Sequence, residues 1–270
     1  MQLLGDVVHH PSDSLREVVM RAIWYGSMVV GLFLFAVPAR ADEQAEGKAL
    51  LEKAVKALGA EVKLGKLTAG TFKGKLTANG PDSKEMTANV EGSWQGLDQF
   101  RIEAEVNEGA VQKGVIVVNR DKAWFSGGGR IEEAPKEVLD LLLPDLYALK
   151  LASTPLLVDK ESKLSPLGEV KVGGRATWGL KVSCKGRADV DLYLDQENGL
   201  PLKCEVRVTE PGGNDEVAHE FLFGDYKDVD GVKHFTKLTL NRKGTKTFEL
   251  ELSEVKREEK VDDTSFGKPE

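Results

Sequence analysis

The sequence predicts a mainly β protein with helices, an α+β fold built on one curved antiparallel sheet. Along several successive stretches apolar and polar residues alternate, which is typical of strands with one buried face. The dipeptides Asn198-Gly199 and Asp230-Gly231 lie between β-rich segments and favour tight hairpin turns, which join antiparallel strands. We therefore expect a sheet with one apolar face and one solvated face.

The first 41 residues have the features of a secretory signal peptide. Arg21 precedes the apolar run Ala22–Val37, and residues 38–41 supply an A-x-A site, so cleavage is expected after Ala41. The run is shorter than the about 20 residues of a membrane span. Because the stretch before Met20 is polar, translation from Met20 is a second hypothesis. Residues 42–270 are then one exported domain, periplasmic or otherwise outside the cytoplasm and soluble after cleavage.

The charge balance argues against a nucleic-acid partner. The chain has 37 basic and 44 acidic residues, a formal net charge of −7, and the predicted signal peptide holds equal numbers of each sign. Binding to phosphates requires a basic footprint, which this composition does not supply.

Two cysteines, Cys184 and Cys204, would share a compartment that permits disulfides. Cys204 lies two predicted strands after Cys184, so the strand between them would hold their Cα atoms about 9–10 Å apart. A disulfide requires less than about 7 Å. Two half-buried thiols are therefore favoured over a bond between them.

The first predicted helix covers residues 42–61. Leu50, Leu51, Val55 and Leu58 recur at helical spacing, and Gly59 stands where a C-cap glycine is expected. This helix is interpreted either as a lid on the sheet or as an ordinary core helix, and both interpretations use the same residues.

A second helix is predicted over residues 134–151. Pro135 suits its first helical position, and the many leucines leave little polar face, so the helix should be buried on most sides. Pro144 should kink or split it.

About eleven strands fill the rest of the chain, from Thr71 to the closing amphipathic stretch 247–255. An antiparallel sheet this wide, with one apolar face, curls instead of remaining flat. We expect a half-barrel with the two helices over its concave face. The helices either fill the hollow or leave an elongated apolar cavity, and the residues alone leave both alternatives open.

The motifs of enzymes and metal sites are missing. We find no G-x-S-x-G, H-E-x-x-H or C-x-x-C pattern, and the aspartates 225–230 lack the glutamate of a calcium loop. If Asp230-Gly231 is a two-residue turn, His234 faces Lys227 and His219 faces Arg242, so the histidines lie about 26 Å apart and cannot share a metal. We expect no enzyme activity and no cofactor.

In the order of these segments, the mature chain resembles the LolA-like superfamily of secreted, lipid-binding half-barrels. The resemblance rests on KALLEKAVKALG, GSWQGLDQFRIEAEV, GVIVVNRDKAWF, LYLDQENGLP and YKDVDGVKHFTKLTL, together with the middle helix. It implies a curved sheet whose helices cover a concave side that holds acyl chains. The resemblance also implies a role for Arg101, which matches an arginine that helps hold the lid closed in the lipoprotein carrier of this superfamily. The proline-glycine that usually precedes this strand in the family is absent here. The alternative to the lid role is that Arg101 is a solvated strand residue beside Glu103.

The first functional hypothesis is an exported carrier for acyl chains of a lipoprotein or lipid, with a membrane-associated protein as donor or acceptor. Its candidate cavity-lining residues are Trp94, Phe100, Ile102, Trp124, Leu141, Leu142, Leu146, Phe221, Phe223, Leu238 and Leu250. The alternative is an exported sensor or scaffold module that uses the same fold, with its cavity filled, to bind a protein partner.

Overall fold

The computed structural model describes residues 36–59, 65–79, 85–108, 110–155, 158–210, 213 and 215–270. The apolar run of the predicted signal peptide, up to residue 35, and Met20 lie outside the described residues. The chain divides into two compact units, residues 1–43 and 44–270, and the sheet and the core belong to the second. Among the described helices, none has both the length and the hydropathy that a membrane crossing requires.

Strands dominate the second unit, as the sequence predicts. The helices are α2 (Ala36–Leu58), α4 (Lys136–Ser153) and the short 3-10 helix η2 (Asp263–Phe266). The strands are β1 (Ala69–Asn79), β2 (Glu85–Gln95), β3 (Gln99–Glu108), β4 (Ala110–Asn119), β5 (Lys122–Gly127), β6 (Arg130–Glu133), β7 (Lys163–Val172), β8 (Arg175–Ser183), β9 (Val190–Asp195), β10 (Pro201–Thr209), β11 (Glu216–Gly224), β12 (Lys227–Val229), β13 (Val232–His234), β14 (Lys237–Arg242) and β15 (Thr245–Glu258).

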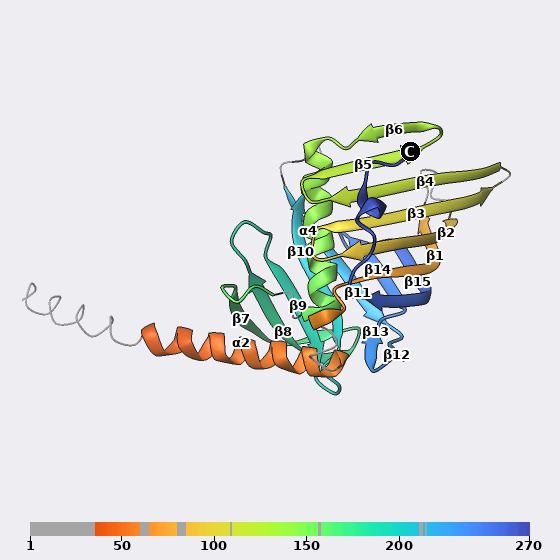
Figure 1. Ribbon diagram of the computed structural model, residues 1–270. Helices are drawn as coiled ribbons and strands as arrows, with labels where there is room; N and C mark the ends of the chain where they lie inside the picture. Colours follow the sequence, from red (N-terminus) through yellow and green to blue (C-terminus); the bar gives the residue numbers. More distant parts are fainter. Residues whose placement is uncertain are drawn as a thin grey trace, which may run out of the picture. The chain divides into compact units, whose positions relative to one another are not determined.

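In the described part of the chain, thirteen strands form one open antiparallel sheet, in the order β6-β5-β4-β3-β2-β1-β15-β14-β11-β10-β9-β8-β7. Strand β15 pairs with β1 on one side and β14 on the other, so it joins the N-terminal strands to the C-terminal ones. Figure 1 shows the sheet curving around α4, with β2 to β5 extending beyond the helix. The predicted fold class is confirmed.

The strand count exceeds the expected eleven for two local reasons. The chain turns back after Gly128-Gly129 and forms β6, just before the predicted second helix. The second hairpin is also interrupted, because its end separates from the main sheet as the two-stranded ribbon β12-β13. The predicted register of that hairpin is confirmed, since Lys227 pairs with His234 and His219 pairs with Arg242.

Both helices differ from the prediction at their ends. Helix α2 begins at Ala36, upstream of the expected start at residue 42, and ends before Gly59, whose φ is +142°. Pro135 occupies the N-cap position of α4 and not its first helical turn. Pro144 lies inside α4 without splitting it, because contacts of the helix on the sheet outweigh one lost backbone hydrogen bond.

The core lies between the helices and the face of the sheet that we call the inner face. Its buried members come from α2, from α4 and from alternate positions of the strands. Leu50 and Ala54 of α2 and Tyr147, Ala148 and Leu151 of α4 contact the inner face. Alternation therefore decides which strand residues contact the helices.

The C-terminal segment covers part of the opposite, outer face. Phe266 is fully buried and packs with Ala69, Val117, Val261 and the partly buried Trp124. The carboxamide of Gln95 accepts a hydrogen bond from the backbone of Val261 at 3.0 Å. The tail is therefore part of the folded unit.

Replacing Phe266 with alanine should lower the free energy of unfolding by about 3 kcal/mol, because it removes a fully buried ring. Urea unfolding monitored by circular dichroism measures this change. The exposed Lys268→Ala is the matched control in the same tail, and its effect should stay within about 0.5 kcal/mol. Equal midpoints for the two variants would contradict a structural role for the tail.

Candidate functional site

Buried polar contacts hold α4 against the inner face. Asp145, near the middle of the helix, lies beside His219 of β11, a residue with no exposed surface. The Nδ1 group of His219 donates to the two carboxylate oxygens of Asp145 at 2.8 and 3.0 Å. Nε2 is also buried and has no hydrogen-bond partner among the described residues. The pair fixes both the rotation and the position of α4 on the sheet.

Lys150 makes a second buried contact, one turn further along α4. Its side chain donates to the backbone carbonyl of Gly96 at 2.9 Å, in the turn between β2 and β3, and to that of Gln99 at 3.4 Å, the first residue of β3. Burial lowers the pKa of Lys150 to about 7, opposed by the nearby carboxylate of Asp98 and assisted by the positive charge of Arg257. Neutral and charged forms of this amine are therefore both accessible near neutral pH.

Arg257 of β15 holds the end of α4. Its guanidinium donates to the carbonyl of Ser153 at 2.8 Å and to the hydroxyl of Thr154 at 2.9 Å. It also donates to Nδ1 of His234 at 3.2 Å. Burial, together with the charge of Arg257, lowers the pKa of His234 to about 4, so this imidazole is neutral at pH 7. A cation at a helix C-terminus is favourable because the last carbonyls carry partial negative charge.

The inner face has a closed region under the helices. Phe221 and Leu240 are 1% exposed, and Leu192 is fully buried. Strands β8 to β11 and β14 supply most of these side chains, and α2 and α4 contact them. This region is a core in the ordinary sense, filled by the chain's own side chains.

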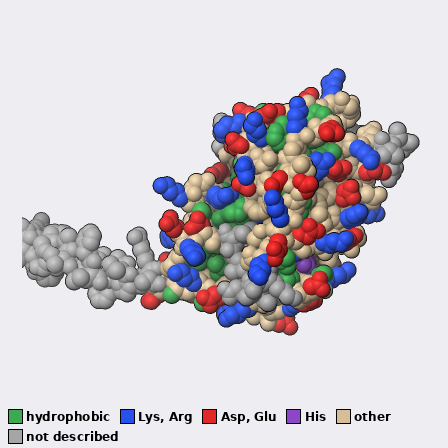
Figure 2. Space-filling view, viewed as in Figure 1, with side chains coloured by type: hydrophobic (Ala, Val, Ile, Leu, Met, Phe, Trp, Pro, Cys, Tyr) green, Lys and Arg blue, Asp and Glu red, His purple; other side chains and the backbone are tan. Residues whose placement is uncertain are grey.

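The inner face also has a region that is only partly covered. It consists of apolar side chains of β2, β3 and α4 that are intermediate in exposure and border the core. We call it the open inner surface: Trp94, Phe100, Ile102, Ala104, Val106, Leu141 and Leu142. Figure 2, viewed as Figure 1, shows hydrophobic side chains reaching the surface between charged ones.

Aromatic rings form the floor of this surface at one end. The ring of Phe72 in β1 stacks with Trp94 at 6.3 Å and with Phe100 at 6.1 Å between centroids. Gly92 of β2 pairs with Phe72 and leaves room for its ring, because a Cβ at Gly92 would lie 2.5 Å from that ring. Flat, apolar and without charge, this arrangement suits contact with hydrocarbon and supplies no group for acid-base chemistry.

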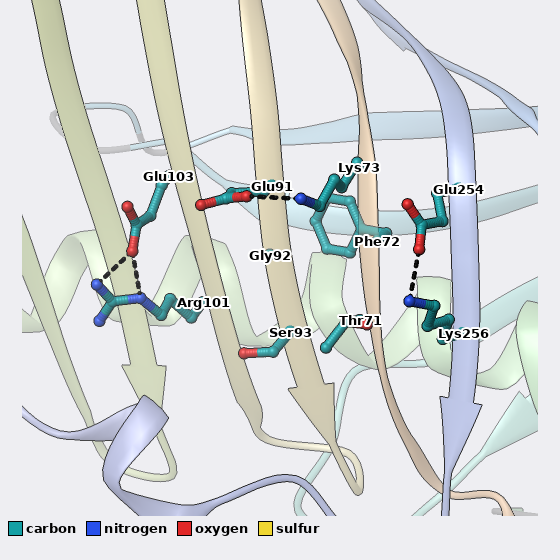
Figure 3. Close-up of a pocket in the computed structure, with 10 residues that line it drawn as sticks. All are labelled: Thr71, Phe72, Lys73, Glu91, Gly92, Ser93, Arg101, Glu103, Glu254 and Lys256. Atoms are coloured by element: carbon teal, nitrogen blue, oxygen red, sulfur yellow. Dashed lines mark hydrogen bonds and ion pairs between the residues drawn. The ribbon is translucent and has the colours of Figure 1, made fainter.

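Two depressions in the described part of the chain lie on the outer face. The first, of about 280 Å³, is lined mainly by polar side chains of β1, β2, β3 and β15. Figure 3 shows its charged residues pointing away from α4 and pairing among themselves, as Lys73 does with Glu91 at 3.5 Å and Lys256 with Glu254 at 2.7 Å. Its polar lining does not suit an acyl chain.

Several solved structures resemble this chain in fold. No family model matches the sequence, and no curated protein matches it. Among solved structures, similar ones include a domain assigned to outer membrane lipoprotein sorting from Vibrio parahaemolyticus and a LolA superfamily protein from Nitrosomonas europaea. Each aligns with a TM-score of 0.53 at 13% identity over 82% of this chain and 97% of the other. The chain has the LolA-like fold.

A third solved structure supports the same relationship. A DUF1329 family protein from Desulfovibrio piger aligns with a TM-score of 0.51 at 12% identity, over 82% of this chain and 96% of the other. The predicted resemblance to LolA-like proteins is therefore confirmed as a likeness of fold.

Within this LolA-like fold the predicted cavity residues separate into three groups. Five lie on the open inner surface: Trp94, Phe100, Ile102, Leu141 and Leu142. Five are at most 8% exposed and belong to the core: Leu146, Phe221, Phe223, Leu238 and Leu250. The last, Trp124, lies on the outer face.

The position of Trp124 differs from the expectation because of the parity of β5. Trp124 pairs with Val117, and Val117 pairs with Arg101, all on the outer face. The neighbouring Phe125 pairs with Ile116, which pairs with Ile102, so Phe125 points to the inner face. In a short strand with two adjacent aromatic residues, the sequence does not reveal which one points inward.

In the described part of the chain, Arg101 hydrogen-bonds to neither of the long helices, α2 and α4. Its Nε donates to Glu103 at 2.9 Å, and its Nη1 donates to the carbonyl of Ser265 at 3.4 Å. It therefore lies on the outer face and contacts the C-terminal segment. The pairing with Glu103 is the alternative that the sequence analysis named.

Cys204 does not have the environment of a reactive thiol. Both cysteines are free. Cys204 lies on β10 and Cys184 directly follows β8, and β9 lies between these two strands in the sheet. Burial and the nearby carboxylate of Asp145 raise the pKa of the Cys204 thiol well above its usual range, so it remains protonated. Among the described residues, no group of His, Cys, Asp or Glu is placed to bind a metal.

The buried contacts of α4 were missed by sequence reasoning. His219 was considered only as a possible metal ligand, and Asp145 and Lys150 were not singled out. The signal was present, since Asp145 and Lys150 are the charged residues of the later, leucine-rich part of α4. A charged residue on an otherwise apolar helix indicates a buried partner.

Lys150 should make the stability of the chain depend on pH. Below about pH 7 it is protonated in both states; between about pH 7 and pH 10 the unfolded chain binds more protons, so stability rises with pH. Lys150→Met should remove this rise. Urea unfolding at several pH values gives the free energy of unfolding of the parent and of the variant, and the difference between them as a function of pH measures the effect. The exposed Lys136→Met is the control and should keep the slope of the parent. Equal slopes in all three proteins would contradict the buried amine.

Proposed function

We propose that the chain is an exported carrier that shelters the acyl chains of a lipoprotein or lipid against the open inner surface. The observation that supports this best is a continuous set of partly buried apolar side chains on β2, β3 and α4, next to a closed core. Each CH₂ group that leaves water contributes about 0.8 kcal/mol. Several CH₂ groups of an acyl chain on this surface therefore outweigh a modest entropic cost of ordering the bound chain.

The fold supports the proposal in a second way. A solved structure of the same fold is assigned to outer membrane lipoprotein sorting. The predicted leader of residues 1–41 fits a chain that works outside the cytoplasmic membrane, where a membrane-associated donor or acceptor would deliver or receive the acyl chain.

The ligand would contact few charged groups. The charged side chains of β2 and β3, such as Glu91 and Glu103, alternate with the apolar ones and point to the outer face. Selectivity for a head group would therefore be slight, and affinity would follow chain length. Deeper insertion would require α4 to move, which the contacts of Asp145, Lys150 and Arg257 oppose.

Leu142→Arg and Ile102→Arg should each weaken binding of a fluorescent fatty acid at least tenfold, because a charge would lie against hydrocarbon on the open inner surface. Titration of probe fluorescence measures the dissociation constant, and native mass spectrometry measures co-purified lipid.

The matched control is Val229→Arg, since Val229 is 41% exposed on β12, away from the open inner surface. It should bind as the parent does. If the parent binds neither probe nor lipid, the carrier proposal fails and a filled core with a protein partner is favoured. If all three variants bind equally, the ligand does not use this surface.

Export should leave a chain that begins at Asp42. Mass spectrometry of the processed protein should give the mass of residues 42–270, and mass spectrometry of an uncleaved precursor distinguishes a start at Met1 from a start at Met20. A protein that retains residues 22–37 after export would contradict the proposed leader.

A further inference from the structure

The two edges of the open sheet differ in how they are protected. β6, at one edge, has only the four residues Arg130–Glu133 and carries three charges. β7, at the other, has ten residues, and a strand of that length presents unpaired N–H and C=O groups to solvent. A long edge strand is a template for pairing with another strand.

The first part of β7 is closed by α2. The side-chain amide of Gln44 accepts from the backbone of Leu164 at 2.7 Å and donates to the carbonyl of Ser162 at 3.1 Å. One side chain thus makes the two hydrogen bonds that a neighbouring strand would make. Gly47 brings the helix so close that a Cβ there would lie 2.7 Å from the Cβ of Leu164.

The second part of β7 has no such cover in the described chain. The pairing with β8 shifts between Pro166 and Gly168, and after the shift Glu169, Val170 and Lys171 are all exposed. Val170 is 39% exposed, and Leu167 beside it is 37% exposed. Among the described residues, these are two of the three large hydrophobic side chains that are this exposed.

The ladder between β7, β8 and β9 determines which backbone groups face the open edge. The carbonyl of Ala176 in β8 accepts a hydrogen bond from the backbone N–H of Gln196, which follows β9. Because successive residues of a strand direct their backbone groups to opposite sides, the next residue, Thr177, directs its N–H and C=O to β7. Thr177 pairs with Val170, whose carbonyl also accepts from the hydroxyl of Thr177 at 2.7 Å. Because direction alternates along a strand, the free N–H and C=O groups belong to Glu169 and Lys171.

We propose that this segment, Gly168–Val172, pairs antiparallel with the same segment of a second copy of the chain. In the register centred on Val170, Glu169 of each copy lies opposite Lys171 of the other, and these are the residues whose backbone groups are free. The two Val170 side chains then form the closer, non-hydrogen-bonded pair and bury each other. The segment is complementary to itself in hydrogen bonding, in charge and in apolar contact.

The proposed pairing has limits set by the same strand. The shift at Leu167 precedes the segment and the turn at Gly173-Gly174 follows it, so few residues on each side take part. The contact is therefore small, and the dimer should depend on concentration. It would join two sheets edge to edge and leave the open inner surface of each copy free.

Charge exchange tests the register without disturbing the fold, because both side chains are exposed. Glu169→Lys or Lys171→Glu alone places like charges opposite each other twice and should weaken dimerisation about tenfold. The double variant E169K/K171E restores opposite charges and should dimerise as the parent does. Sedimentation equilibrium over a range of concentrations measures the dissociation constant, with circular dichroism as the check on folding.

Crosslinking gives an independent readout. In the Cys184→Ser background, Val170→Cys should form a disulfide-linked dimer on mild oxidation, because paired residues of this type have Cβ atoms about 4.5–5.5 Å apart. Val172→Cys is the matched control, since its two copies would lie more than about 13 Å apart.

Three results would overturn the proposal. The first is a parent chain that sediments as a monomer at every concentration. The second is a double charge variant that dimerises no better than the single variants. The third is equal crosslinking at positions 170 and 172.

Discussion

One requirement shapes this molecule: a sheet of thirteen strands has an apolar face too wide to leave in water. Helix α4 lies across that face together with α2, and buried polar side chains hold α4 there. Asp145 binds His219, Lys150 binds the turn at Gly96, and Arg257 binds the end of the helix. Buried polar groups are costly unless paired, so these contacts favour one position of α4 over all others that leucine packing alone would allow.

That position divides the inner face. Where α4 and α2 lie over β8 to β11 and β14, side chains such as Phe221 and Leu240 are excluded from water. On β2 and β3 the cover is incomplete, and residues such as Trp94 and Ile102 remain partly exposed. The fold thus combines a stable core with an apolar surface of limited extent. An acyl chain would use the second without disturbing the first.

The open sheet has a further consequence, because closure is the device that removes edges and this sheet does not close. The chain protects its edges by other means. A short charged strand ends one side, and the amide of Gln44 with the close approach of Gly47 covers the start of the other. The outer face is protected differently, by ion pairs and by the returning C-terminal segment around Phe266.

The sequence by itself determined the class of the fold, its hairpins and its helices. Alternation and turn dipeptides depend on neighbours in the chain, so the register that places His219 opposite Arg242 could be predicted. What only the tertiary structure decided was which side chains meet across the sheet. Trp124 faces outward, Arg101 binds the tail, and five of the eleven expected cavity residues belong to the core. Asp145 and His219 lie 74 residues apart, and no local pattern links them. Contacts of that kind depend on the position of a helix over a curved surface, and that position is set by the packing of the whole chain.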